Sequence, residues 1–174
     1  MSTVVAPHLI LAVTALVSLV AISVKRSLTV TVSITTVGQA LTVAAVAPAL
    51  NAAPRAVGPL VVIDGLALFV TALAALLGLA IGLLAHATLP RRPEAGDEFH
   101  VLLVLAVLGA ASLAAATHFA SLLLGLELLS VSLYGLIAYT ASRPRPVEAG
   151  VKYLVLAGVA SAVLVFGMAC VYAA

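Results

Sequence analysis

Residues 122–139 read LLLGLELLSVSLYGLIAY, and their single charged side chain is that of Glu127. An apolar run of this length matches the roughly 20 residues that a helix needs to cross the hydrocarbon core of a bilayer. A charged side chain at that depth costs at least about 2.5 kcal/mol. The stretch therefore predicts a membrane helix that keeps a carboxyl group near its middle at an energetic cost.

The composition of the whole chain agrees with a membrane protein. Of its 174 residues, 64% are hydrophobic and 8% are charged, whereas soluble domains carry about 25% charged residues. The net charge of +2 does not indicate nucleic-acid binding, because the basic residues lie in short loops without interleaved aromatic residues. One cysteine excludes an internal disulfide and a cysteine-based metal site.

Blocks of apolar residues repeat along the chain and predict an all-α, polytopic membrane bundle. The expected spans are residues 8–24, 27–50, 61–87, 99–116, 119–141 and 149–173. The second span contains LTVTVSIT (28–35), whose alternation of apolar and hydroxylated residues is typical of a strand in water. An isolated strand would leave backbone groups unsatisfied in lipid, and Thr or Ser can bond to carbonyls one turn back, so we expect a helix here.

The distribution of Lys and Arg predicts how the bundle is oriented. The first, third and fifth loops contain Lys25, Arg26, Arg91, Arg92, Arg143 and Arg145, while the second contains Arg55 and the fourth contains none. Basic loops stay on the cytoplasmic side. We therefore expect both termini on the outer side of the membrane.

Small residues recur at helical spacing in two of the spans. Gly78 and Gly82 form a GxxxG pair in the third span, and Ala157, Gly158 and Ser161 align in the sixth. Small side chains let membrane helices approach closely. The pattern predicts close helix packing at both places.

Glu127 is the main candidate functional residue. It lies about 12 Å from the outer end of its span at about 1.5 Å per residue, and Ser130 and Tyr134 share its helical face. Hydroxyl groups at this spacing would hold water against the carboxylate, whose protonation would respond to a moving charged partner. The alternative interpretation is a permanently protonated, hydrogen-bonded structural Glu.

Lys152, in EAGVKYLVLAG (148–158), is the second intramembrane charge. A Lys one turn inside a helix can extend its ammonium group to the interface. It can also be a second station on a hydrated path, without a direct ion pair, since Glu127 lies about 21 Å from the connecting loop and Lys152 about 6–9 Å. The residues alone leave both interpretations open.

The histidines and the remaining carboxylates give weaker signals. His118 and His86 are candidates for feeding or draining a proton path, because histidine titrates near neutral pH; interfacial polar residues are the alternative. Asp64 is expected at a helix N-terminus, and Glu94, Asp97 and Glu98 in a solvated loop. There is no phosphate-binding loop, dinucleotide fingerprint, nucleophile elbow or metal-ligand cluster.

Several motifs together resemble a known family. GLELLSVSLYGLIAY (125–139) and EAGVKYLVLAGVASAVLVFGMACVYA (148–173), with VVIDGLALFVTAL (61–73) and DEFHVLLVLAVLG (97–109), are similar to the antiporter-like membrane subunits of bacterial proton-translocating NADH:quinone oxidoreductase, respiratory complex I, and within these to subunit N. The resemblance implies that Glu127 is an essential protonatable group and that Lys152 belongs to the same charged axis. Residues 1–90 would form three N-terminal helices, and residues 91–174 would begin the first antiporter-like repeat.

The resemblance also implies the setting of this chain. It would be a non-redox translocase subunit of the bacterial inner membrane, without a cofactor of its own. Its partners would be other membrane subunits, antiporter-like ones above all, and partner subunits would use NADH, FMN, iron–sulfur clusters and quinone. Family members have about fourteen helices, so this chain is expected to be a fragment or a split subunit. A cation/proton antiporter subunit and a purely structural membrane fragment remain alternatives.

Overall fold

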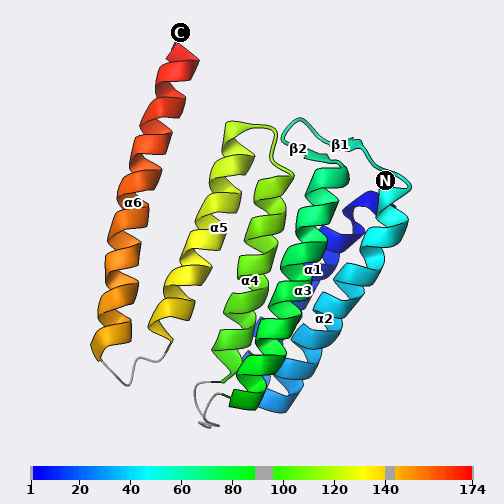
Figure 1. Cartoon of the computed structure of the whole chain (residues 1–174), viewed down its shortest axis with the longest axis vertical. Coiled ribbons are helices and arrows are strands. Elements are labelled where there is room, and N and C mark those ends of the chain that lie inside the picture. The colour runs from blue at the N-terminus through cyan, green and yellow to red at the C-terminus, as the bar shows by residue number, and fades with distance from the viewer. Residues whose placement is uncertain (1, 89–95, 140–143, 174) are drawn as a thin grey trace.

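Six helices, joined by short connections, run back and forth along one direction in this computed structural model (Figure 1). The structure describes residues 2–88, 96–139 and 144–173. The helices are α1 (Ser2–Val24), α2 (Leu28–Leu50), α3 (Gly65–Thr88), α4 (Asp97–Ala114), α5 (Phe119–Ala138) and α6 (Pro144–Ala173). All six are long and apolar enough to cross a membrane, which confirms the predicted polytopic helix bundle.

The connections lie at two ends of the bundle. Lys25, Arg26 and Arg145 lie at one end, which we call the Lys/Arg-rich end. Both chain ends and the turn between α4 and α5 lie at the opposite end (Figure 1). Arg91, Arg92, Glu94 and Arg143 lie outside the described residues.

The second connection contains a small sheet that the sequence did not indicate. Strands β1 (Arg55–Val57) and β2 (Val61–Ile63) pair antiparallel, with Ala56 opposite Val62. The Val62 amide also donates to the Ala115 carbonyl at 2.9 Å. The expectation that a helix begins at residue 61 is therefore wrong, because these bonds hold 61–63 extended. Asp64 then caps α3, since its Oδ1 accepts from the Ala67 amide at 2.7 Å, and this part of the expectation is confirmed.

The second span is a helix despite its alternating sequence. Its hydroxyl groups donate to carbonyls one turn back in α2, as in Thr35 to Thr31 at 2.9 Å and Thr42 to Gly38 at 2.8 Å. These bonds satisfy the hydroxyl groups inside the helix itself. Both the predicted helix and its predicted hydrogen bonds are confirmed.

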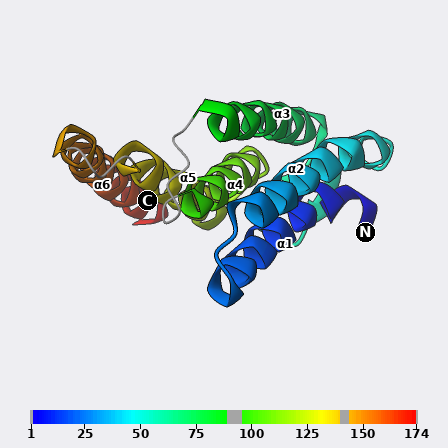
Figure 2. The same cartoon turned by 90° about the horizontal axis from the view of Figure 1, so that it is seen from below.

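Helices α1 to α4 pack into one group, and α5 and α6 extend from it beside α4 (Figure 2). An apolar cluster fills the centre of the group; it consists of Leu11, Ala15, Ala75, Val104, Val107 and Ala111. Gly78 lies against Gln39 and Val107, and both Gly78 and Gly82 are buried. The predicted close packing at this glycine pair is confirmed.

Helix α6 differs from the other five because it packs mainly against α5. Among the described residues of α6, Gly150 and Met168 are buried, Met168 only just, while Phe166 and Leu156 are exposed. Nothing lies within 4 Å of the position where a Cβ on Gly158 would be. The predicted close packing at Gly158 is therefore wrong within the described part of the chain. The helix also begins at Pro144, five residues before the predicted start, since proline is tolerated in a first helical turn.

Candidate functional site: a membrane carboxylate between α5 and α6

The helix that carries Glu127 is fixed at its first turn by a cap. His118 Nδ1 accepts from the Ala120 amide at 3.1 Å, and Ser121 Oγ accepts from the His118 amide at 3.4 Å. Because Nδ1 accepts a hydrogen bond, Nε2 of the neutral ring carries the proton, and it lies 2.9 Å from the Tyr172 hydroxyl of α6. His118 thus connects the start of α5 to the end of α6.

The middle of α5 lies directly against α4. A Cβ on Gly109 would lie 2.6 Å from the Leu129 nitrogen, and a Cβ on Gly125 would lie 2.8 Å from the Leu113 nitrogen. The two glycines therefore allow the helix backbones to touch. Glu127 lies between Gly125 and Leu129 in sequence, so its side chain leaves α5 on the face away from α4.

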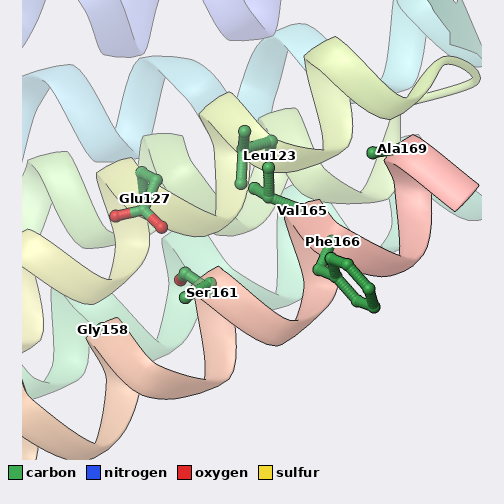
Figure 3. Close-up of a pocket in the computed structure, with 8 residues that line it drawn as sticks. Leu123, Glu127, Gly158, Ser161, Val165, Phe166 and Ala169 are labelled. Atoms are coloured by element: carbon green, nitrogen blue, oxygen red, sulfur yellow. The ribbon is translucent and has the colours of Figure 1, made fainter.

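The Glu127 side chain reaches a groove between α5 and α6. Figure 3 shows the carboxylate on the α5 side and Ser161 on the α6 side. The groove has a volume of about 700 Å³ and is lined by Leu123, Glu127, Gly158, Ser161, Ala162, Val165, Phe166 and Ala169. Glu127 is the one charged residue of this lining, so the groove presents a single ionisable group to an apolar surface.

Ser130 and Tyr134, predicted on the face of Glu127, lie toward the Lys/Arg-rich end of α5. Ser130 is buried. The Tyr134 ring contacts the Tyr153 ring of α6 edge-on, with centroids 5.4 Å apart. Tyr134 therefore lies where α5 and α6 contact each other, on the Lys/Arg-rich side of the groove.

Lys152 does not meet Glu127 in the described structure. Its ammonium group lies 2.5 Å from Glu148 Oε1, one turn earlier in α6, and its side chain is 69% exposed. Because α6 begins at Pro144, Lys152 lies two turns into the helix instead of one. The predicted lack of a direct ion pair between Glu127 and Lys152 agrees with this geometry.

His86, the other histidine singled out above, lies in the last turn of α3. It belongs to a second group of polar residues that includes His100, Asp97 and Glu98 of α4. The expectation that Asp97 and Glu98 lie in a solvated loop is wrong. Helix α4 begins at Asp97, which is 4% exposed, and Glu98 pairs with Arg26 at 2.6 Å. A run of charges before an apolar block looked like a loop, and only the packing of α4 shows that it starts the helix.

Tyr139 adjoins this second group at the end of α5. Its ring contacts Phe99 edge-on at 5.2 Å. Burial raises the pKa of the Tyr139 phenol, and the charges of Glu98 and Asp97 add to the effect. No sequence pattern indicated this contact, because it joins the end of α5 to the first turn of α4.

Two comparisons with known proteins bear on the chain. Residues 116–174, which contain α5 and α6, match the membrane family described as NADH:quinone oxidoreductase/Mrp antiporter, TM. The whole chain is similar to a chain of respiratory complex I from Thermus thermophilus with bound aureothin, at 32% identity and a TM-score of 0.83. The similarity covers 97% of this chain and 36% of that chain, so this chain spans about a third of its relative.

The matched segment is the one that contains the groove and both of its walls. The structural likeness extends this match over the four helices before it. The resemblance predicted from the sequence is therefore confirmed: residues 116–174 match this antiporter-like membrane family, and the chain shares the fold of a membrane chain of respiratory complex I.

Proposed function

We propose that this chain relays protons across a membrane as part of an N-like subunit of NADH:quinone oxidoreductase. The observation that carries the proposal is Glu127, a carboxyl group in the middle of a membrane helix that faces a groove. The likeness to a complex I chain supports the same conclusion.

In this proposal the Glu127 carboxylate is the group that binds and releases the proton. A carboxyl group in apolar surroundings holds its proton until a cation comes near, and it then releases the proton because the ionised form is stabilised. The groove leaves the Glu127 oxygens accessible from the α6 side. Ser130 and Tyr134 would support water between Glu127 and the Lys/Arg-rich end.

Lys152 is the proposed second charged station. Its present partner is Glu148, and an exposed i, i+4 pair of this kind is worth only a few tenths of a kcal/mol. Lys152 can therefore leave Glu148 at little cost when another carboxylate or a water chain becomes available. His118 and His86 are weaker candidates, and His118 already has a structural task at the start of α5.

The proposed setting is a bacterial inner membrane, with the Lys/Arg-rich end in the cytoplasm and both chain ends outside. Other membrane subunits would complete the path, because this chain spans only part of its relative. Partner subunits holding NADH, FMN, iron–sulfur clusters and quinone would supply the energy for proton translocation. This chain would contribute the proton-translocating groups and no redox chemistry.

The first test is association. A tag on this chain should comigrate with a large NADH-oxidising assembly on a native gel. A small band without NADH oxidation would instead place the chain in an antiporter or in a structural role, and sodium-dependent exchange would then select the antiporter.

The second test is Glu127→Gln in the native membranes. We expect NADH-driven proton pumping to fall by at least about tenfold, the usual size of an effect from removing one proton-transfer group, while assembly of the complex persists. Glu127→Asp, which keeps a titratable carboxyl group, should retain much more of the pumping. Unchanged pumping in an assembled Glu127→Gln complex would contradict the proposed role.

A further inference from the structure

A second group of ionisable residues lies away from the groove, at the Lys/Arg-rich end of α3 and α4. It consists of His86 in α3 and of Asp97 and His100 in α4, and we call it the His–Asp cluster. His86 and Asp97 both lie within electrostatic range of the His100 ring. Asp97 and His100 are one helical turn apart, so they share a face of α4.

Two of the three residues are buried: Asp97 and His100 are each 4% exposed, and His86 is half-buried. Within the described residues, Asp97 Oδ1 and His86 Nδ1 are buried atoms without a hydrogen-bond partner. Such an atom costs about 1–3 kcal/mol, and native proteins contain few of them. Two such unpartnered atoms within one group of three residues indicate that the group can accept a proton.

Two glycines of α3 lie beside polar side chains of the neighbouring helices. A Cβ on Gly82 would lie 3.6 Å from His100 Nδ1, so the ring lies over that glycine. One turn deeper, about 6 Å along the helix, Gly78 lies against Oε1 of Gln39, which is 2% exposed. In the part of the chain that the structure describes, Oε1 of Gln39 is also buried without a partner.

The polar groups therefore extend from the Lys/Arg-rich end toward the middle of the bundle and stop there. Beyond Gln39 the apolar cluster of Val104, Val107 and Ala111 closes the path. His8, on the far side of that cluster, bonds the Ala111 carbonyl at 3.3 Å. The polar side chains beside this glycine pair thus form a row between α2, α3 and α4 that begins at the Lys/Arg-rich end and stops at Gln39.

Other charges surround the cluster on each packed element. Arg26, in the turn between α1 and α2, neutralises Glu98 at 2.6 Å, and Tyr139 lies at the end of α5 within range of Asp97 and Glu98. Within the described residues, Glu98 Oε2 is also buried without a partner. Across the described ranges, no three His, Cys, Asp or Glu side chains are grouped so as to hold a metal ion. The ligand that suits a carboxylate and two imidazoles in this space is a proton.

We propose that His86, Asp97 and His100 form a second proton-binding site, which loads from the Lys/Arg-rich end and is separate from Glu127 and Lys152. The proton binds a ring nitrogen lone pair of one histidine, and the Asp97 carboxylate balances the resulting positive charge. The two rings repel each other when both are charged, so the pair takes up protons stepwise. This proposal does not depend on proton relay through Glu127.

The test follows the protonation of the rings in the full chain, reconstituted in lipid bilayers with isotope-labelled histidine. Nuclear magnetic resonance reports the state of each of the four histidines over about pH 4–9, the range around the ordinary histidine value. We expect Asp97→Asn and His86→Gln each to move the titration midpoint of His100 by about 1 pH unit, as a close charge does. The two moves should have opposite signs, because one substitution removes a negative charge and the other a positive one.

Two controls separate coupling from damage to the fold. Gly82→Ala places a methyl group against the His100 ring without changing any charge, so it should leave the His100 midpoint in place. The ring signals of His118, at the opposite end of the bundle, should be the same in all variants. If Asp97→Asn does not fold, His86→Gln carries the test.

The proposal is overturned if the His100 midpoint is the same in folded His86→Gln and in the unmodified chain. It is also overturned if neither ring changes protonation over this range.

Discussion

At the scale of single residues, two glycines of α3 lie against polar side chains in the bundle: Gly78 against Gln39, and Gly82 against His100. The two glycines are one turn apart and look equivalent in sequence, but their surroundings differ. The Gly78 position is crowded by Gln39 and Val107, whereas the nearest atoms at Gly82 are in ordinary van der Waals contact.

Gly78→Ala should therefore destabilise the chain, because the added methyl group displaces the Gln39 amide and Val107. Overpacking of this kind costs about 1–3 kcal/mol. The measurement is the temperature at which the detergent-solubilised protein unfolds and is lost from solution on heating. Gly82→Ala is the matched control and should unfold close to the unmodified chain. Equal effects of the two substitutions would contradict the packing described here.

Tyr139 gives a prediction in alkali. Burial raises the pKa of its phenol, with Glu98 and Asp97 contributing further, so Tyr139 should stay neutral above about pH 10, where an ordinary tyrosine ionises. A pKa raised by folding contributes stability that is fully present below the unfolded value and is lost as the pH rises through the folded value. Glu98→Gln should lower the pKa of Tyr139 while leaving the contribution of burial.

The measurement is the ultraviolet absorbance of tyrosinate as the pH is raised. The chain has four tyrosines, so the difference from Tyr139→Phe isolates this residue. Ionisation of Tyr139 at the ordinary value would show that the contact with the first turn of α4 does not form in solution.

At the scale of elements, the backbones of α4 and α5 lie in direct contact at Gly109 and Gly125. A methyl group at either position would meet backbone atoms of the other helix, which cannot rotate away. Gly109→Ala and Gly125→Ala should each lower the free energy of unfolding by about 1–3 kcal/mol. Gly135→Ala is the control on the same helix, because its methyl group would meet the flexible end of Leu102. Gly109→Ala and Gly125→Ala should therefore unfold at lower temperatures than Gly135→Ala. An equally low unfolding temperature for Gly135→Ala would argue against the backbone contact.

The elements also show what the sequence could and could not predict. Long apolar blocks give all six helices, and hydroxyl groups that bond within α2 explain why its alternating sequence does not become a strand. Boundaries were less predictable, because they depend on distant partners: Val62 is held in a strand by Ala115. The carboxylate of Glu127 could be recognised from its cost in lipid. The burial of Asp97 could not be predicted. A run of charged residues at a helix start has the same sequence whether packed helices or water surround it.

At the scale of the whole molecule, the charge distribution predicts how the bundle lies in the membrane. In a background in which Cys170, the one cysteine, is replaced by alanine, Asn51→Cys should react with a membrane-impermeant thiol reagent on intact cells. Ser27→Cys, at the Lys/Arg-rich end, should react only in inverted vesicles. Ser27 makes no side-chain cap bond, so its replacement leaves α2 intact. The reverse pattern would place the Lys/Arg-rich end outside and would reverse the direction proposed for proton loading.

The backbone contact between α4 and α5 has a mechanical consequence for Glu127. Gly125 and Leu129, the two α5 residues at that contact, flank Glu127 in sequence. When two crossed rods rock against each other, the crossing point moves least and the free ends move most. Glu127 is therefore at the fulcrum of its helix, where tilting of α5 leaves the depth of the carboxylate nearly unchanged. Such tilting would instead shift Tyr134 and Tyr139, so the neighbours of the carboxyl group move while the group itself stays in place.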